Sequence, residues 1–212
     1  VMRGIGRAAF PIYCFLLTEG FIYTKNFFRY ALRLFVFSLI SEPFFDLAIY
    51  DRLYYPDYQN VYFTLLISIL CLHLLKSLRE RPGELFGFIR GFKGGALFKL
   101  LVSPVFIYIC FGAAIGGSMA AAHYLKTDYS YKGVLVIVLM YLLRGKGLPG
   151  TAAGELPLYY EPLAFFSLIP ISLYNKKRGR IGGNIGRYFF YAFYPAHLFV
   201  LYLISYFCGL RG

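Results

Sequence analysis

The sequence contains no tryptophan and few charged residues, and its few cysteines show no metal-binding spacing. Charged residues make up 15% of the 212 residues and hydrophobic ones 59%, whereas soluble domains have about 25% charged and about 45–50% apolar residues. Polar residues are too few to cover a soluble core, which excludes an ordinary soluble domain. Without tryptophan, any aromatic belt at a membrane surface must come from tyrosine. The cysteines lie singly inside apolar runs, and we expect inert thiols and no bound metal: Cys14, Cys71, Cys110 and Cys208.

The apolar residues form long blocks separated by short charged clusters, which is the pattern of a protein that crosses a membrane several times. Each block is continuously apolar and does not alternate, which favours helices over a β-barrel. The sequence therefore predicts an all-α, polytopic transmembrane helix bundle that forms a single domain over residues 1–212. We expect about seven spans, near 8–24, 31–50, 60–77, 97–123, 131–144, 161–175 and 188–209.

Two segments between these blocks differ in composition. Residues 82–95 place phenylalanines between basic residues and glycines, which predicts a short helix lying in the membrane interface. Residues 145–162, "GKGLPGTAAGELPLYYEP", are rich in glycine and proline, which predicts a long loop.

The chain is strongly basic, with 22 lysines and arginines against 10 acidic residues and a net charge of +12. The basic residues gather between the apolar blocks, as the positive-inside bias and anionic lipid headgroups favour. We expect a lipid bilayer as partner and no nucleic acid, because no nucleic-acid-binding signature accompanies the charge. The same rule places loop 76–99 in the cytoplasm and loop 51–59 outside. Counting seven spans then puts the basic segment 175–187 outside, and this conflict stays open.

Polar side chains within the predicted spans are the first candidates for a functional site. Such groups cost several kcal/mol in hydrocarbon and usually face a bundle interior or a water-filled cavity. Glu19 lies toward the end of the first span, and Glu42 directly precedes a proline in the second. Arg29 and Arg33 are one helical turn apart, so both guanidinium groups share a face. Asn60 and Thr64 likewise share a face at the start of the third span.

Structural explanations compete with a functional one for several of these residues. Arg29 suits an interfacial anchor whose charge reaches water along the membrane surface. Glu19 and Glu42 could instead form buried pairs with Arg7 and Arg33. His73 and His123 lie near span ends and are more typical of interfacial histidines. By contrast, His197 lies deep in the last span and two residues after Pro195, which opens the helical hydrogen-bond ladder. His197 either takes part in the chemistry or forms a hydrogen bond that holds the last helix in place.

Five blocks in consistent order resemble the TraX family. They are "IGRAAFPIYCFLLTEGFIYTKNFFRYALRL", "FSLISEPFFDL", "NVYFTLLI", "LKTDYSYKGVLVIVLMYLLR" and "FFYAFYPAHLFVLYLI", and the resemblance runs from about Arg3 to Ile204. The resemblance implies an integral protein of the bacterial inner membrane that is associated with N-terminal acetylation of conjugative pilin. It also implies kinship with membrane acyltransferases that use acetyl-CoA. The matching positions are Arg7, Pro11, Glu19, Arg33, Glu42, Asn60, Thr64, Asp128, Tyr129, Tyr194, Pro195 and His197.

The chain departs from the family pattern in two places. The family usually begins with a further helix that carries an aspartate–histidine pair, and we expect that helix to precede Val1 in a longer protein. The block "DYSYKG" also replaces the family's tighter Asp-Tyr-Gly. The first departure bears on whether this chain alone is active, and the second on the position of the turn that follows.

The resemblance implies the roles of the candidate residues. Acetyl transfer needs a general base, donors for the oxyanion and cations for the phosphates of the cofactor. Histidine suits the first role and arginine the last. We expect His197, Glu19 and Tyr194 in catalysis, with Glu42 and Asp128 as further polar groups. The expected acetyl-CoA site consists of Arg7, Arg29, Arg33, Asn60 and Thr64.

The acceptor and the reaction itself stay open at this point. A pilin, another peptide, a glycan or a lipid would each suit the same chemistry, with an amine or a hydroxyl as the acceptor. Two other functions compete with the enzyme. One is a transporter or channel whose polar residues line a path, and the other is a non-catalytic assembly factor.

Overall fold

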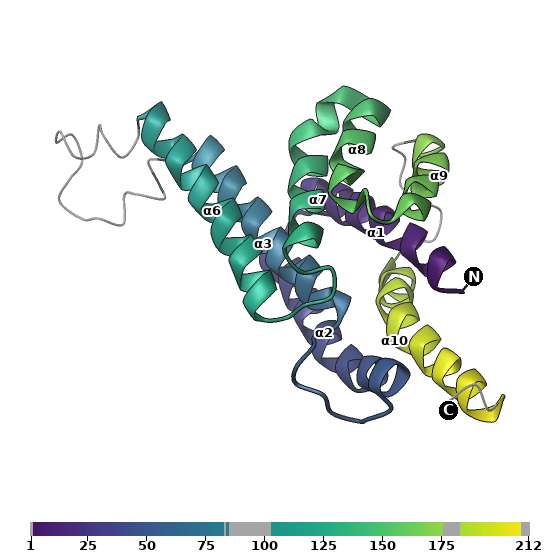
Figure 1. The fold of residues 1–212 in the computed structure, drawn as a ribbon. Helices are drawn as coiled ribbons and strands as arrows, with labels where there is room; N and C mark the ends of the chain where they lie inside the picture. The colour runs from purple at the N-terminus through teal and green to yellow at the C-terminus, as the bar shows by residue number, and fades with distance from the viewer. Residues whose placement is uncertain (1, 83, 85–102, 176–182, 209–212) are drawn as a thin grey trace.

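The computed structural model describes residues 2–82, 84, 103–175 and 183–208, and for residues 2–8 and 183–187 it describes the backbone alone. Within these residues the chain is helical, which confirms the predicted all-α class (Figure 1). The predicted interfacial helix at 82–95 falls almost entirely outside the described residues. Most of the basic segment 175–187 also lies outside them.

The helices follow the predicted apolar blocks closely. Four stretches are long and apolar enough to cross a membrane: Val61–Glu80, Pro104–Tyr124, Ser130–Leu158 and Tyr188–Phe207. Ala9–Tyr23 and Pro162–Ser172 are shorter apolar helices, so the seven predicted spans are an approximate count. The elements are α1 (Met2–Tyr23), α2 (Phe27–Tyr50), α3 (Val61–Glu80), α6 (Pro104–Tyr124), α7 (Ser130–Leu143), η1 (Arg144–Lys146), α8 (Gly147–Glu155), η2 (Leu156–Leu158), η3 (Pro162–Ser167), α9 (Leu168–Ser172) and α10 (Gly183–Phe207).

Polar caps set the starts of three long helices. The Oδ1 of Asn26 accepts a hydrogen bond from the backbone N–H of Arg29 at 2.9 Å. The Oδ1 of Asn60 accepts one from the N–H of Tyr62 at 2.9 Å, and Ser103 caps α6 in the same way. Each cap satisfies one of the N–H groups that have no partner inside the helix.

Helix α7 is the centre of the bundle and packs against α1, α3, α6 and α8. Its sequence is apolar on every side, as expected for a helix without a solvent face, and Val134, Val136 and Ile137 are fully buried. Gly133 allows α7 to approach α3, because a Cβ there would lie 2.7 Å from Cγ2 of Thr64. Beside α7, the antiparallel pair α3 and α6 extends to one side of the molecule (Figure 1).

The loop predicted for residues 145–162 is wrong, because much of it folds as α8, which packs along α7. The chain turns at Gly147, whose φ of 64° favours glycine. Two further glycines then bring the helices together. A Cβ on Gly150 would lie 2.2 Å from the carbonyl oxygen of Leu143, and one on Gly154 would lie 2.8 Å from Cγ of Met140. The glycines that predicted a loop are the small residues that close helix packing requires.

Helix α10 packs against α2 and carries the proline of the last span. Pro195 has no N–H, so the carbonyl of Tyr191 loses its helical donor. The hydroxyl of Tyr62, from α3, donates to this oxygen at 2.9 Å. The hydrogen bond that the proline removes is thus replaced from a neighbouring helix, and His197 does not supply it.

Candidate functional site

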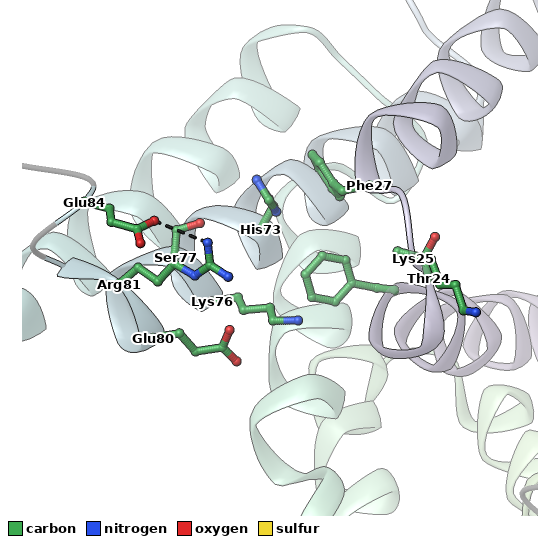
Figure 2. A pocket seen from close by; sticks show the side chains of 10 residues that line it. Thr24, Lys25, Phe27, His73, Lys76, Ser77, Glu80, Arg81 and Glu84 are labelled. Atoms are coloured by element: carbon green, nitrogen blue, oxygen red, sulfur yellow. Dashed lines mark hydrogen bonds and ion pairs between the residues drawn. The ribbon is translucent and has the colours of Figure 1, made fainter. Parts of the chain in front are cut away.

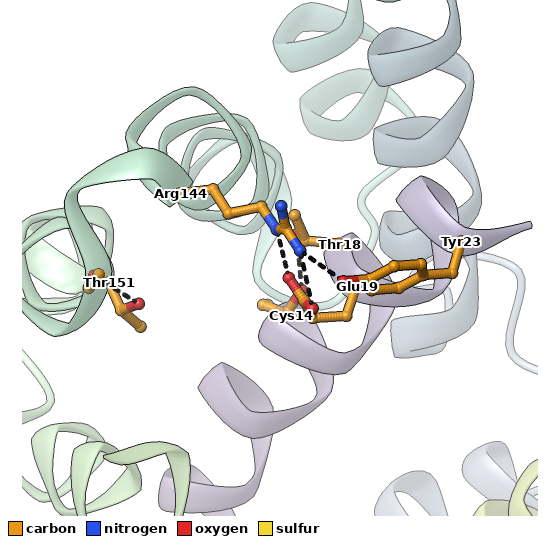
Figure 3. A network of polar contacts seen from close by, with 7 residues as sticks. Cys14, Thr18, Glu19, Tyr23, Arg144 and Thr151 are labelled. Atoms are coloured by element: carbon orange, nitrogen blue, oxygen red, sulfur yellow. Dashed lines mark hydrogen bonds and ion pairs between the residues drawn. The ribbon is translucent and has the colours of Figure 1, made fainter. Parts of the chain in front are cut away.

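A part-buried ion pair joins α1 to η1, at the end of α7. Arg144 donates from Nε to Oε1 of Glu19 at 2.5 Å and from Nη2 to Oε2 at 3.1 Å. The same Nη2 also donates to the hydroxyl of Tyr23 at 3.2 Å, as Figure 3 shows. The Glu19 side chain is only 7% exposed, and two parallel hydrogen bonds are the geometry that holds a carboxylate most firmly.

A cavity of about 810 Å³ opens beside this ion pair, and we call it the basic cavity. Among the described residues, three cations line it, Lys25, Arg29 and Arg33, and Glu19 is the one acidic residue. The N-terminal end of α2 also borders it through the cap residue Asn26. Helix N-termini and guanidinium groups both favour anions, so this cavity suits a phosphate-bearing ligand.

Two smaller cavities adjoin the basic cavity. One, of about 330 Å³, shares Glu19 and Tyr174 with it and is also lined by Arg144 and Thr151; we call it the α8 cavity. The hydroxyl of Thr151 donates a hydrogen bond to the carbonyl oxygen of Gly147 at 3.3 Å. Glu19 therefore forms part of the wall of both cavities.

A second polar cluster lies further along α2 and α3. The amide of Asn60 donates to the carbonyl of Ser38 at 2.8 Å and also to Oε2 of Glu42. The backbone N–H of Asn60 donates to the same Glu42 oxygen at 3.3 Å. Glu42 therefore contacts Asn60, and its expected alternative pairing with Arg33 is wrong. These contacts join the start of α3 to the middle of α2.

The turn before α7 completes this second cluster. The hydroxyl of Thr64 donates to the carbonyl of Asp128 and lies 3.0 Å from the hydroxyl of Thr127. The Oδ1 of Asp128 accepts from the N–H of Tyr129 at 3.1 Å and from the hydroxyl of Tyr58 at 3.4 Å. Burial, with a smaller contribution from the negative charge of Glu161, raises the pKa of Asp128 from 3.8 to about 6, although the hydrogen bonds from Tyr129 and Tyr58 act in the opposite direction.

Backbone strain accompanies Asp128. Tyr129 has a φ of 62° and Ser130 a φ of 47°, a region that residues with a Cβ seldom occupy. The ring of Tyr129 stacks on Phe10 with a centroid distance of 3.5 Å. Such strain persists only where surrounding contacts impose it, and it concentrates at functional sites.

His197 lies on α10 next to the second cluster. Its Nδ1 is 3.1 Å from the carbonyl oxygen of Phe193, and its ring meets that of Tyr194 at 5.4 Å. Tyr194 in turn packs edge-on against Tyr62 at 5.1 Å. Because a carbonyl oxygen only accepts, Nδ1 carries the proton and the lone pair is on Nε2. In this tautomer the imidazole is able to accept a proton at Nε2.

The expected site residues therefore form two groups and not one. Glu19, Arg29 and Arg33 line the basic cavity, whereas His197 lines none of the three cavities. The side chain of Arg7 lies outside the described residues. The second group, around the start of α3, contains Glu42, Asn60, Thr64, Asp128, Tyr194 and His197.

Sequence reasoning missed two residues of the first group. The sequence analysis assigns neither Arg144 nor Lys25 to the site. The ion pair joins positions 125 residues apart, so no local spacing reveals it. A signal did exist for Lys25, since it lies four residues before Arg29 in the sequence.

Comparison with known proteins gives the family of this chain. The family model described as TraX protein matches residues 1–205. The chain is also similar to the probable fimbrial assembly protein FimC, serogroup H1, of Dichelobacter nodosus. The two are 29% identical over 216 residues, which cover 94% of this chain and 81% of that protein. No solved structure matches the chain significantly.

Proposed function

The chain belongs to the TraX family, and from this premise we propose that it is a membrane acetyltransferase that uses acetyl-CoA. The acceptor is an amine or a hydroxyl, and the N-terminus of a pilin or another peptide is our first choice. The name of the fimbrial assembly relative supports a role connected with pili. We place the protein in the inner membrane of a bacterium, as the family resemblance implies.

The single observation that carries the proposal is the composition of the basic cavity. Its volume of about 810 Å³ is within the usual range for ligand pockets, about 300–1,000 Å³. Its three cations face one carboxylate, and that carboxylate is already held by Arg144. An anionic ligand therefore meets a surplus of positive charge there. The residues fit the phosphates of acetyl-CoA, which supplies an acetyl group activated as a thioester.

Arg29 and Arg33 are the proposed phosphate ligands, joined by Lys25. The Nε of Arg33 is buried and has no hydrogen-bond partner among the described residues, so at least one N–H of its guanidinium group is available to a ligand. Asn60 and Thr64 have structural partners in the second cluster, and we no longer include them in the donor site. Glu19, which borders both cavities and is held by Arg144, lies at the boundary between the donor site and the α8 cavity.

His197 is the proposed general base, through its free Nε2. It lies six residues after Tyr191, which lines the basic cavity. At 1.5 Å per residue this is about 9 Å along α10. Tyr194, beside the imidazole, is the proposed donor to a developing oxyanion. A flexible ligand arm is therefore required between the phosphate end and the reacting end.

The direct test is acetyl transfer by the purified protein in lipid nanodiscs, with labelled acetyl-CoA and a peptide that has a free N-terminus. The same peptide with a blocked N-terminus, a glycan and a lipid serve as the other acceptors. Arg33→Ala should weaken acetyl-CoA binding, and Arg33→Lys should restore it only partly, because lysine lacks the bidentate fork. Unchanged affinity in a folded Arg33→Ala variant would remove Arg33 from the donor site.

A matched pair of histidine variants tests the base. His197→Gln should lower the rate on the order of a hundredfold, whereas His123→Gln, at an exposed position, should not. If His197→Gln keeps the wild-type rate, the histidine is structural. Should no acceptor be acetylated, a non-catalytic assembly factor becomes the better account, and the fimbrial assembly relative favours it.

A further inference from the structure

A third cavity, of about 540 Å³, lies between the C-terminal part of α3 and the turn that joins α1 to α2 (Figure 2). We call it the α3 cavity. It shares Thr24 and Lys25 with the basic cavity, so this turn forms a common rim. The proposed function leaves the α3 cavity without an occupant.

The wall of this cavity combines cations with aromatic rings. The Nζ of Lys76 lies over the ring of Phe21, 5.9 Å from its centroid. Phe27 and His73 stack on each other with centroids 3.8 Å apart and planes inclined by 6°. Aromatic surfaces of this kind offer a purine base a stacking contact, and lysine is a compact charge suited to phosphate.

Two acidic residues, Glu80 and Glu84, also line the cavity, and against Lys25, Lys76 and Arg81 they leave a net positive charge. Glu84 pairs with Arg81 at 3.3 Å, and Figure 2 shows this pair far from Lys25. Glu80 lies beside Lys76 on α3, but the Lys76 side chain extends away from it across the cavity, toward α1 and the turn (Figure 2). Of the two cations that remain, Lys25 belongs to both cavities and Lys76 to the α3 cavity. Positive charge thus continues from Lys76 through Lys25 to the arginines of α2.

We propose that the α3 cavity binds the base and the 3′-phosphate of the donor nucleotide, with Lys76 and Lys25 as the phosphate ligands. This inference rests on the proposed use of acetyl-CoA. That molecule carries a phosphate monoester on its ribose and a diphosphate further along, so it needs cations in two adjoining places. The diphosphate then lies on the side of Arg29 and Arg33. Lys76 is therefore a specificity residue, because the 3′-phosphate that it binds takes no part in the acetyl transfer.

The test compares acetyl-CoA with 3′-dephospho-acetyl-CoA by titration calorimetry on the protein in nanodiscs of zwitterionic lipid. Such lipid contains no phosphate monoester, so a preference measured there belongs to the nucleotide. Wild-type protein should bind acetyl-CoA about tenfold to a hundredfold more tightly, as expected for charge-assisted hydrogen bonds. Lys76→Met keeps the apolar stem on Phe21 but removes the charge. It should weaken acetyl-CoA binding alone and bring the two affinities together.

Lys76→Arg should retain most of the preference, and Lys146→Met, at an exposed position of η1, should leave both affinities unchanged. Equal affinities in the wild type, or equal losses of both in Lys76→Met, would overturn this inference while the proposed function stands. If the wild type binds neither nucleotide, both proposals fall together.

Discussion

The hydrogen bond from Tyr62 to α10 permits a prediction that isolates one contact. Pro195 leaves the carbonyl of Tyr191 without a helical donor, and the Tyr62 hydroxyl donates to it at 2.9 Å. Tyr62 is only 6% exposed, so water has little access to replace this hydrogen bond when the hydroxyl is removed. We expect Tyr62→Phe to lower the free energy of unfolding by about 1–2 kcal/mol, because the part-buried carbonyl of Tyr191 loses this donor.

A double-mutant cycle separates this bond from the loss of other contacts. In Pro195→Ala the backbone N–H of residue 195 is restored and donates to the Tyr191 carbonyl within the helix. In that background Tyr62→Phe should cost less than about 0.5 kcal/mol, which gives a coupling energy of about 1–2 kcal/mol. The coupling is specific, because the two side chains belong to different helices and are linked through one oxygen atom.

Because the chain has no tryptophan, unfolding is best followed by circular dichroism or by proteolysis in mixed micelles. Tyr159→Phe is the control, since Tyr159 is 75% exposed and its hydroxyl should contribute nothing measurable. An equal cost of Tyr62→Phe with and without Pro195 would show that the hydroxyl does not compensate for the proline. The account of α10 given above would then be wrong.

Three other predictions concern packing, charge and pH. Gly150→Ala places a Cβ against the α7 backbone and should destabilise the fold by about 1–3 kcal/mol or more; Gly112→Ala, where nothing lies within 4 Å, should instead stabilise it by up to about 1 kcal/mol. Glu19→Gln should lower the free energy of unfolding by about 1 kcal/mol, because Arg144 is 36% exposed and keeps its hydrogen bond to Tyr23; a fully stable variant would show that the charge of Glu19 is dispensable. Asp128 has a folded-state pKa above its unfolded value, so its contribution to stability is greatest below about pH 4 and is lost as the pH rises to about 6. Asp128→Asn should abolish this part of the pH dependence and raise stability at pH 7 by up to about 3 kcal/mol; unfolding titrations that keep the same slope between pH 4 and 6 would exclude Asp128 as its source.

The long helices were predictable because each depends on local sequence. In the hydrocarbon core of a membrane no water is available to the backbone N–H and C=O groups of a run such as 60–77. These groups must therefore bond to one another, and a helix achieves this within the segment. The cap at Asn60 also marks where α3 begins. The all-α class and the approximate positions of the spans follow from these local constraints alone.

Helix α8 was not predictable from composition, because glycine has two opposite meanings. At Gly147 a positive φ makes glycine a turn residue, as the sequence suggested. At Gly150 and Gly154 the missing Cβ instead permits contact with α7. Only the presence of the partner helix decides between these meanings, and that is tertiary information.

The site was predictable as a set of residue types but not as an arrangement. Arg29 and Arg33 share a cavity because they lie one turn apart on α2, which their spacing reveals. The partner of Glu19 is Arg144, from the end of α7, and the partner of Glu42 is Asn60, at the start of α3. Both pairings depend on how the helices cross, which local sequence does not reveal. The alternative pairing of Glu42 with Arg33 was excluded by spacing alone, because nine residues within one helix separate the two side chains by about 14 Å.

The division of the polar residues into two groups constrains any reaction that the protein performs. Glu42 follows Arg33 by nine residues on α2, which is about 14 Å along the helix axis, or almost half the thickness of a bilayer's hydrocarbon core. In the proposed reaction the phosphates bind near Arg33 while His197 belongs to the other group. The ligand must therefore reach along the contact between α2 and α10, the two helices that border both groups. Because Tyr62 fixes α10 beside α3 at this level, the Tyr62→Phe variant should impair acetyl transfer more than it weakens acetyl-CoA binding. Equal losses of both would place the base in the basic cavity itself and argue against His197.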